Sequence, residues 1–262
     1  MTEAVTHNTL IRVGGVPFVV ASLQSATISV IRAAQGHEAV SVRLSNAYCV
    51  ALASRDNAYA ELLTDDGLNY PDGAPVAWCM RRWASGGDER PSQIRGPSLF
   101  ESVLADGVGS ELRHFFLGAE PATITQLCRK VERKYPGIQI AGAFSPPFGP
   151  LNEEFYGECT GKILEAKPDL VWVALGTPKQ DFAASELARR TSLTCVAVGA
   201  AFDFIAETTP QAPTWVQGSG FEWVFRLATE PRRLWRRYLI GNTLFIWAAI
   251  HDRFKHRSGA TS

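Results

Sequence analysis

Three stretches of the chain repeat one pattern, in which an apolar run ends at or beside a glycine and a helical segment follows. The apolar runs are HFFLG at 114–118, DLVWVALG at 169–176 and TCVAVGA at 194–200. Helical patterns follow them at about 121–134, 178–190 and 201–207. Because these runs do not alternate with polar residues, they are typical of strands buried on both faces in a parallel sheet. The order therefore predicts a Rossmann-like α/β fold, with a mostly parallel sheet and helices on both faces.

The remaining segments extend this architecture toward both ends of the chain. Near the N-terminus the sequence predicts a hairpin around Gly14 and Gly15, strands at 39–45 and 67–70, and helices at 23–34, 46–56 and 73–83. The segment 220–254 has the pattern of successive helices broken at Pro231 and near Gly241. We assign residues 1–215 to an α/β core and residues 216–262 to a C-terminal helical appendage.

Composition is that of a soluble globular protein and excludes several classes. Lys and Arg together equal Asp and Glu, at 26 each, so no overall field favours nucleic acid. The five cysteines never form a C-x-x-C pair, which favours buried thiols in a reducing compartment. The five histidines are far apart, so a metal site built on them is not expected. Neither a secretory signal nor a membrane-spanning run is visible, and we expect a cytoplasmic protein.

Positive charge is concentrated near the C-terminus. Residues 221–262 contain eight basic and three acidic residues, a net charge of +5, which leaves −5 for the rest of the chain. Spacings of four residues place four arginines along one helix stripe: Arg232, Arg233, Arg236 and Arg237. Such a stripe is either a solvated helix face or a phosphate-binding surface. The apolar run 244–250 is too short to cross a membrane, but it is long enough to enter the membrane interface.

Ligands of parallel α/β sheets bind beyond the carboxyl ends of the strands. That rule places five residues on one rim: Asn46, Asp72, Gly118, Gly176 and Gly199. The chain lacks the G-x-G-x-x-G turn of nicotinamide-binding enzymes, and GECTGKI at 157–163 resembles a P-loop only superficially. It also lacks an Asp-x-Asp motif of the kind that holds a metal against a nucleotide diphosphate.

Asp72 lies in the turn Pro71-Asp72-Gly73, directly before an apolar helical run. Pro, Asp and Gly are common turn residues, so one explanation of Asp72 is purely structural: its side chain caps the following helix. The position on the ligand-binding rim weakens that explanation, and a carboxylate there is a natural general base if it is partly desolvated.

Three further motifs carry candidate binding residues. In LGTPKQDF, Thr177 can cap a helix that starts at Pro178, and its first turn offers N–H groups, Lys179 and Gln180 to phosphate or sugar hydroxyls. The alternative is a well-capped helix without a ligand. Asp203 lies between two phenylalanines and is either a cap or a ligand contact. Arg95 precedes an expected Ser98-x-x-Glu101 capping box and is a candidate partner for an anion.

Several segments in a fixed order carry a specific resemblance. They are SNAYCVALASRDNAYAELL, YPDGAPVAW, IRGPSLFE, FFLGAEP, KYPGIQIAGAFSPPFGPL, VWVALGTPKQDF, VGAAFDFIAETTPQAPTW and GFEWVFRLATEPRRLWRRYL. Each is weak alone, but their order and spacing from about Ser41 to Leu239 resemble the WecG/TagA/CpsF family of bacterial glycosyltransferases. SPPFGPL and WRRYL are most similar to its exopolysaccharide members, such as the xanthan-type glucosyltransferase.

The resemblance implies an inverting, metal-independent transferase. Its members move a sugar from a UDP-sugar to a polyprenyl-diphosphate-linked saccharide at the cytoplasmic face of the membrane. It implies that Asp72 is the catalytic base, and that Asn46 and Gln180 match the family's strand-end Asn and its Pro-Lys-Gln motif. Where the family often has Thr-x-Asn, this chain has Leu44-Ser45-Asn46, so Ser45 is the candidate hydroxyl. The basic C-terminal helices resemble an appendage that closes over UDP and contacts the membrane.

On this interpretation the UDP-sugar lies across the rim, where helix N-termini, Arg226 and the arginine stripe neutralise the diphosphate in place of a metal. Asp72 takes the acceptor proton, and one displacement inverts the sugar. No cofactor is expected, and the partners are the two substrates and the inner membrane surface, where a peripheral location is implied. Two alternatives stay open: a non-catalytic nucleotide-sugar-binding assembly protein and an NAD-dependent oxidoreductase. The sequence does not specify the hexose or N-acetylhexosamine, the linkage or the oligomeric state.

Overall fold

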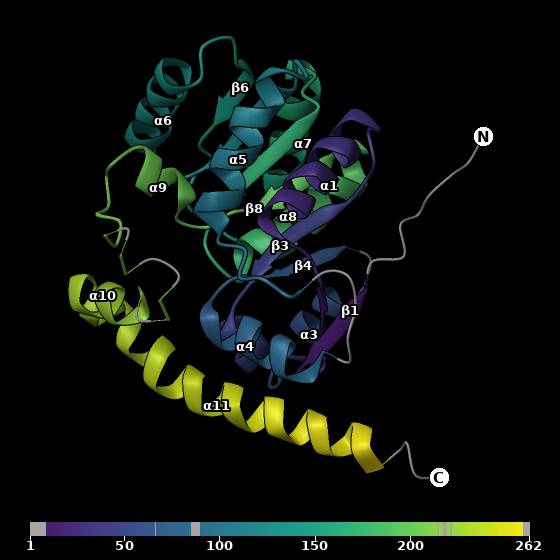
Figure 1. Cartoon of the computed structure of the whole chain (residues 1–262). Helices are drawn as coiled ribbons and strands as arrows, with labels where there is room; N and C mark the ends of the chain where they lie inside the picture. Colours follow the sequence, from purple (N-terminus) through teal and green to yellow (C-terminus); the bar gives the residue numbers. More distant parts are fainter. Residues whose placement is uncertain are drawn as a thin grey trace.

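A six-stranded sheet in which every neighbouring pair of strands is parallel forms the centre of the protein (Figure 1). The structure is a computed structural model and describes residues 9–65, 67–84, 90–213, 215–216, 219–220 and 222–258, with the side chains at 233, 236–240 and 254–258 excepted. The strand order is β4-β3-β8-β7-β5-β6. The strands are β3 Ser41–Ser45, β4 Leu68–Pro71, β5 Arg113–Gly118, β6 Gln139–Phe144, β7 Leu170–Ala174 and β8 Thr194–Ala197. The predicted Rossmann-like α/β class is confirmed.

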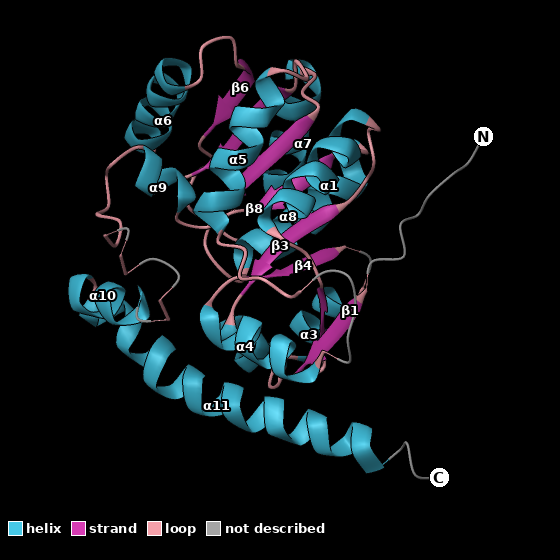
Figure 2. Ribbon diagram, in the orientation of Figure 1, coloured by secondary structure: helices cyan, strands magenta, loops and turns pink. Residues whose placement is uncertain are grey.

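Helices cover both faces of this sheet (Figure 2). On one face lie α1 Leu23–Gln35, α5 Gly96–Val108, α6 Pro121–Lys134 and α9 Ala201–Ile205, and on the other α7 Glu153–Ala166 and α8 Lys179–Thr191. Strand β7 shows why both faces are apolar. Its Trp172 packs with the first group, whereas Val171 and Val173 pack with the second. Successive side chains of a strand point to opposite faces, so a strand buried on both sides is apolar at every position.

A third apolar cluster joins the two ends of the chain. The hairpin of β1 Leu10–Val13 and β2 Val16–Val19 packs with α2 Ala47–Ala53, α3 Asn57–Thr64 and α4 Ala74–Trp83. The last helix, α11 Pro231–Ser258, follows α10 Glu222–Thr229 and runs along this cluster (Figure 1). Its Phe245, Ala248 and Ala249 are buried in the cluster. The appendage is therefore attached to the core by packing, while the expected domain division at 215 stays a prediction.

The structure corrects three local predictions. Helix α11 continues through Gly241, where a Cβ would lie 3.3 Å from the Tyr48 ring, so the glycine allows close packing with α2 rather than a break. The Ser98 capping box is wrong because α5 already begins at Gly96, with Arg95 as its N-cap residue. Thr177 does not cap α8, because the N-cap residue is Pro178 and the helix begins at Lys179. In the part of the chain that the structure describes, no helix is long and apolar enough to span a membrane.

Candidate active site

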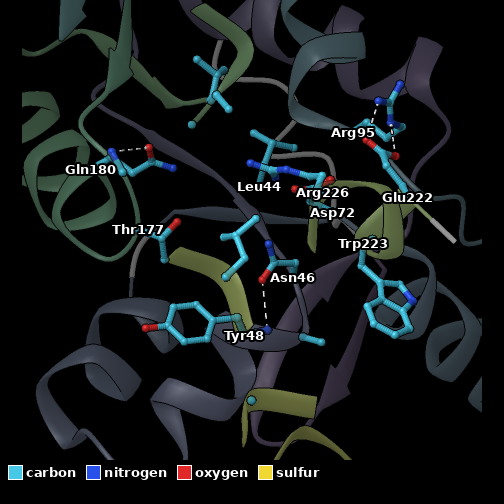
Figure 3. A pocket seen from close by; sticks show the side chains of 18 of the residues that line it. Leu44, Asn46, Tyr48, Asp72, Arg95, Thr177, Gln180, Glu222, Trp223 and Arg226 are labelled. Atoms are coloured by element: carbon cyan, nitrogen blue, oxygen red, sulfur yellow. Dashed lines mark hydrogen bonds and ion pairs between the residues drawn. The ribbon is translucent and has the colours of Figure 1, made fainter. Parts of the chain in front are cut away.

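A cavity of about 940 Å³ lies at the carboxyl ends of the parallel strands, with α10 and α11 contributing to its wall (Figure 3). Its size is close to the upper end of the usual range for ligand pockets, about 1,000 Å³. Many of the residues predicted from the sequence to form the site line it: Asn46, Asp72, Arg95, Gly176, Thr177, Gln180, Gly199, Asp203 and Arg226. The rule that ligands bind at strand ends thus brings together residues from β3, β4, β7 and β8.

Asn46 joins the end of β3 to the start of α2. It is the N-cap residue of α2, and its Oδ1 accepts hydrogen bonds from the backbone N–H groups of Tyr48 at 3.0 Å and Cys49 at 3.4 Å. Capping of this kind satisfies the free N–H groups of a first helical turn. Because the oxygen is occupied in the cap, the amide nitrogen is the donor that Asn46 can present to the cavity (Figure 3).

Asp72 follows β4, next to Asn46 on the neighbouring strand. Its backbone N–H donates to the Ser45 carbonyl oxygen at 3.0 Å, and the Pro71 carbonyl accepts from the N–H of Ile94 at 2.9 Å. Gly73 has a φ of +109°, which side-chain-bearing residues rarely adopt, and it is the N-cap residue of α4. Because Gly73 has no side chain, the N-cap residue of α4 makes no side-chain cap, and Asp72, directly before it, lines the cavity.

Gln180 holds together the loops that follow β7 and β8. Its Oε1 accepts from the N–H of Gly176 at 3.1 Å, and its own N–H donates to the Gly176 carbonyl at 2.9 Å. A Cβ at Gly199 would lie 3.7 Å from Gln180 Nε2, so the amide reaches the next strand end. The side chain is only 3% exposed. Gln180 therefore shapes this part of the cavity wall, with Thr177 beside it (Figure 3).

A buried polar network lies next to this loop and involves Asp181, the residue after Gln180. The Tyr59 hydroxyl donates to Asp181 Oδ2 at 2.7 Å, and burial is the main reason that the pKa of Tyr59 is raised. Arg43 donates to the Leu62 carbonyl, and burial lowers its pKa while the charge of Asp181 opposes that shift. A buried charge is tolerated only with such partners. The network thus fixes the first turn of α8 against α3 and β3.

Three of the predicted binding residues in the α/β core do not line the cavity. Ser45 is 1% exposed within β3. Gly118 ends β5 where a Cβ would lie 2.3 Å from the carbonyl oxygen of Ala174, so the glycine permits close strand packing, and its successor Ala119 lines the cavity instead. The ammonium group of Lys179 donates to the Gly149 carbonyl at 2.6 Å. The structure therefore offers no direct support for ligand contacts by these three side chains.

Helix α10 supplies the wall opposite the strand ends. Arg226 lines the cavity and lies over the Phe204 ring of α9, with 5.7 Å between the guanidinium carbon and the ring centre. Asp203, which precedes Phe204, is also on the wall. Arg95 forms an ion pair with Glu222 of α10: its Nη2 and Nε donate to the carboxylate oxygens Oε1 and Oε2 at 2.7 Å and 3.0 Å (Figure 3).

Of the four arginines in the predicted stripe, the structure describes the side chain of Arg232 alone. Arg232 is exposed and does not line the cavity. The side chains of the other three members, Arg233, Arg236 and Arg237, lie outside the described part of the structure. Their roles stay predictions.

Sequence reasoning missed some of the lining residues. Arg55, Gln93 and Trp223 line the cavity, although no motif pointed to them. Trp223 could have been found from its place between Glu222 and Arg226 in a helix next to the basic tail. Within the described residues, no group of three or more His, Cys, Asp or Glu side chains is arranged to hold a metal ion.

A parallel α/β sheet whose strand ends open into a large cavity with carboxylate, amide and guanidinium groups is typical of Rossmann-like enzymes that bind nucleotide-containing substrates. Comparison with known proteins gives the particular family. Residues 11–259 match the glycosyl transferase WecG/TagA/CpsF family, and the chain belongs to that family. The predicted glycosyltransferase is confirmed, and neither alternative finds support.

Two curated relatives are similar over most of the chain. One, from Bacillus spizizenii, is 32% identical over 188 residues, which cover 71% of this chain and 70% of the relative. The other, from Bacillus subtilis, is 28% identical over 191 residues, with the same two coverages. Both are named N-acetylglucosaminyldiphosphoundecaprenol N-acetyl-beta-D-mannosaminyltransferase.

Proposed function

We propose that this glycosyltransferase moves a hexose or N-acetylhexosamine-type sugar from a UDP-sugar to a polyprenyl-diphosphate-linked saccharide. The observation that carries the proposal is the cavity itself, which is lined by the Asp72 carboxylate, the Asn46 amide and the guanidinium of Arg226. The names of the two relatives support the acceptor class, because they specify a sugar linked through diphosphate to undecaprenol.

Asp72 acts as the general base in this proposal. It lines the cavity from a main chain that is fixed on both sides, so its carboxylate can be held at one position relative to an acceptor hydroxyl. As that hydroxyl oxygen attacks the anomeric carbon, Asp72 takes its proton. The bond from the anomeric carbon to the diphosphate oxygen breaks on the opposite face, and UDP leaves with the electron pair. A single displacement of this kind inverts the anomeric configuration.

The departing diphosphate needs positive charge. Arg226 supplies a guanidinium group to the cavity, and the backbone at Gly199 and Ala200 lines it where α9 begins. Fixed donors and charges of this kind stabilise negative charge as it develops. The proposal is therefore a metal-independent mechanism, in which protein cations take the place of a divalent ion.

Replacing Asp72 with Asn tests the assignment of the base. We expect UDP affinity to be retained and turnover with a polyprenyl-diphosphate saccharide to fall by about 10²- to 10⁴-fold, the usual contribution of general base catalysis. Asp106→Asn, in the exposed part of α5, is the matched control. UDP release is measured across a panel of UDP-sugars, with linkage analysis of the product. Turnover of Asp72→Asn near the wild-type rate would refute the assignment.

We also propose that α11 places the enzyme on the inner membrane surface, where a lipid-linked acceptor would be located. The outward face of this helix exposes Ile246, Trp247 and Ile250, with exposed fractions of 56%, 59% and 52%. Arg253 follows one turn later, with its guanidinium over the ring of Trp83. Exposed apolar and aromatic side chains next to basic ones are typical of helices that lie in a membrane interface.

Sedimentation with liposomes tests this location. A variant with Ile246→Ser, Trp247→Ser and Ile250→Ser should bind vesicles containing anionic phosphatidylglycerol at least about tenfold less tightly, because it loses the apolar area that enters the interface. Leu164→Ser, an exposed apolar residue on α7, is the control. Vesicle binding equal to that of the wild type would contradict the proposed surface.

A further inference from the structure

The Arg95–Glu222 ion pair joins segments that are 127 residues apart in the sequence. Two nitrogens of the Arg95 guanidinium donate to the two carboxylate oxygens of Glu222, at 2.7 Å and 3.0 Å (Figure 3). The side chains are 11% and 22% exposed. A bidentate pair fixes the relative geometry of its two side chains, and removal of one partner leaves the other charge largely buried and unpaired.

The arginine belongs to the rigid part of the site. The N–H of its neighbour Ile94 donates to the carbonyl of Pro71, which directly precedes Asp72. On its other side, a Cβ at Gly96 would lie 2.9 Å from the Val198 carbonyl, so the main chain is packed against the end of β8. The main chain at Arg95 is therefore fixed with respect to the ends of β4 and β8, two of the strands that carry the site.

The glutamate belongs to the wall opposite. Glu222 is the first residue of α10, and the same helix brings Trp223 and Arg226 into the cavity. None of the described residues of α10 is fully buried, so apolar packing contributes less to its position than to that of the core helices. Fixing Glu222 to Arg95 therefore restricts where Arg226 can lie relative to Asp72.

We propose that Arg95 and Glu222 form a latch that holds α10 closed over the cavity and so positions Arg226 for the donor diphosphate. Both are positioning residues, which act through α10 and leave the proton transfer at Asp72 unchanged. This inference rests on the proposed use of a UDP-sugar at the same site. It differs from the expectation that Arg95 itself binds an anion, because here its charge is already used by Glu222.

The two roles of Arg95 predict opposite effects for Glu222→Gln. If the pair is a latch, Arg95→Gln and Glu222→Gln each weaken UDP binding, by about tenfold for the loss of a charged hydrogen-bonded pair. The double variant should then be no weaker than either single one. If instead Arg95 is a phosphate site that Glu222 blocks, Glu222→Gln should bind UDP more tightly than the wild type. Glu101→Gln, which breaks the exposed pair with Lys134, is the matched control and should change nothing.

Calorimetric titration with UDP, steady-state kinetics and hydrogen exchange of the α10 amides together decide the case. The latch predicts a raised KM for the donor with kcat retained at saturation, and faster exchange over 222–229 in both single variants without ligand. Hydrogen exchange over 222–229 that stays at the wild-type rate would overturn the latch, and so would tighter UDP binding by Glu222→Gln. Faster exchange in the variants without any change in the KM for the donor would also overturn it. The exchange measurement needs no substrate, so a wild-type enzyme that fails to use UDP-sugars would refute the proposed function without affecting the test of α10 closure.

Discussion

Lowering the pH should destabilise this protein through one buried histidine. His114 in β5 is fully buried, and its Nδ1 accepts a hydrogen bond from Trp172 Nε1 of β7 at 3.1 Å. Among the described residues its Nε2 has no hydrogen-bond partner. Burial lowers the pKa of His114 from 6.5 to about 4, because the charged imidazolium would lose its hydration; the charge of Asp169 opposes this only in part.

The sign of the effect follows from the two pKa values. Between pH 6.5 and 4 the unfolded chain binds a proton at this residue that the folded chain does not, so the free energy of unfolding falls as the pH falls. His114 has no such effect above its unfolded pKa. At about pH 5 the loss is about 2 kcal/mol, and it approaches about 3 kcal/mol below the folded pKa. Carboxylates interfere little at about pH 5. Glu186, for example, has its pKa lowered to about 2, chiefly by its hydrogen bond from Arg189, and its contribution is lost only in more acidic solution.

Urea unfolding, followed by tryptophan fluorescence at about pH 8 and about pH 5, measures how much unfolding free energy is lost as the pH falls. His114→Gln is the informative variant, because its amide oxygen can still accept from Trp172 but does not titrate. The variant should lose about 2 kcal/mol less than the wild type between the two pH values, whatever its absolute stability. Equal pH dependence of the two proteins would show that His114 is protonated in the folded state and would refute the reasoning.

Two further substitutions test the parts of the rim that do not line the cavity. Gly118→Ala should lower the thermal midpoint of unfolding by several degrees, because the new methyl group would lie 2.3 Å from the Ala174 carbonyl oxygen in a backbone with φ of +113°. Gly149→Ala is the control, because there is open space around that glycine. Equal melting curves for the two variants would contradict the packing argument. Lys179→Met should leave UDP affinity within about twofold, because the ammonium group is bonded to Gly149 and does not line the cavity. A drop of tenfold or more would instead show that Lys179 turns to the donor phosphate.

The central sheet could be predicted because its strands are buried on both faces. β5, β7 and β8 are apolar at nearly every position, and this follows from their contact with helices on both sides. β6 was not identified as a strand, although Gln139–Phe144 pairs with β5. As an edge strand it is largely half-exposed, and the middle of its apolar run is Ala141-Gly142-Ala143, which lacks the large and β-branched residues typical of strands.

The site could be predicted as far as strand order determines it. Carboxyl ends of parallel strands meet at one edge, so Asn46 and Asp72 had to lie together. The direction of a side chain is a different matter, because it depends on partners distant in the sequence. Arg95 was recognisable as a candidate anion partner, but its anion is Glu222, which no local pattern links to it.

The apolar run 244–250 is a second case in which the sequence does not give the direction of the side chains. The structure reduces the residues that could contact a membrane to three. Every residue in the run is apolar, and from the sequence the run was too short to cross a membrane but able to enter an interface. In α11, Phe245, Ala248 and Ala249 face the hairpin and α2, and only Ile246, Trp247 and Ile250 are strongly exposed. The helical period sorts such residues onto two faces, but it does not say which face meets the protein. Membrane contact by this run must therefore depend on the three outward side chains, whereas substitution of the inward ones should unfold the packing that attaches α11 to the core.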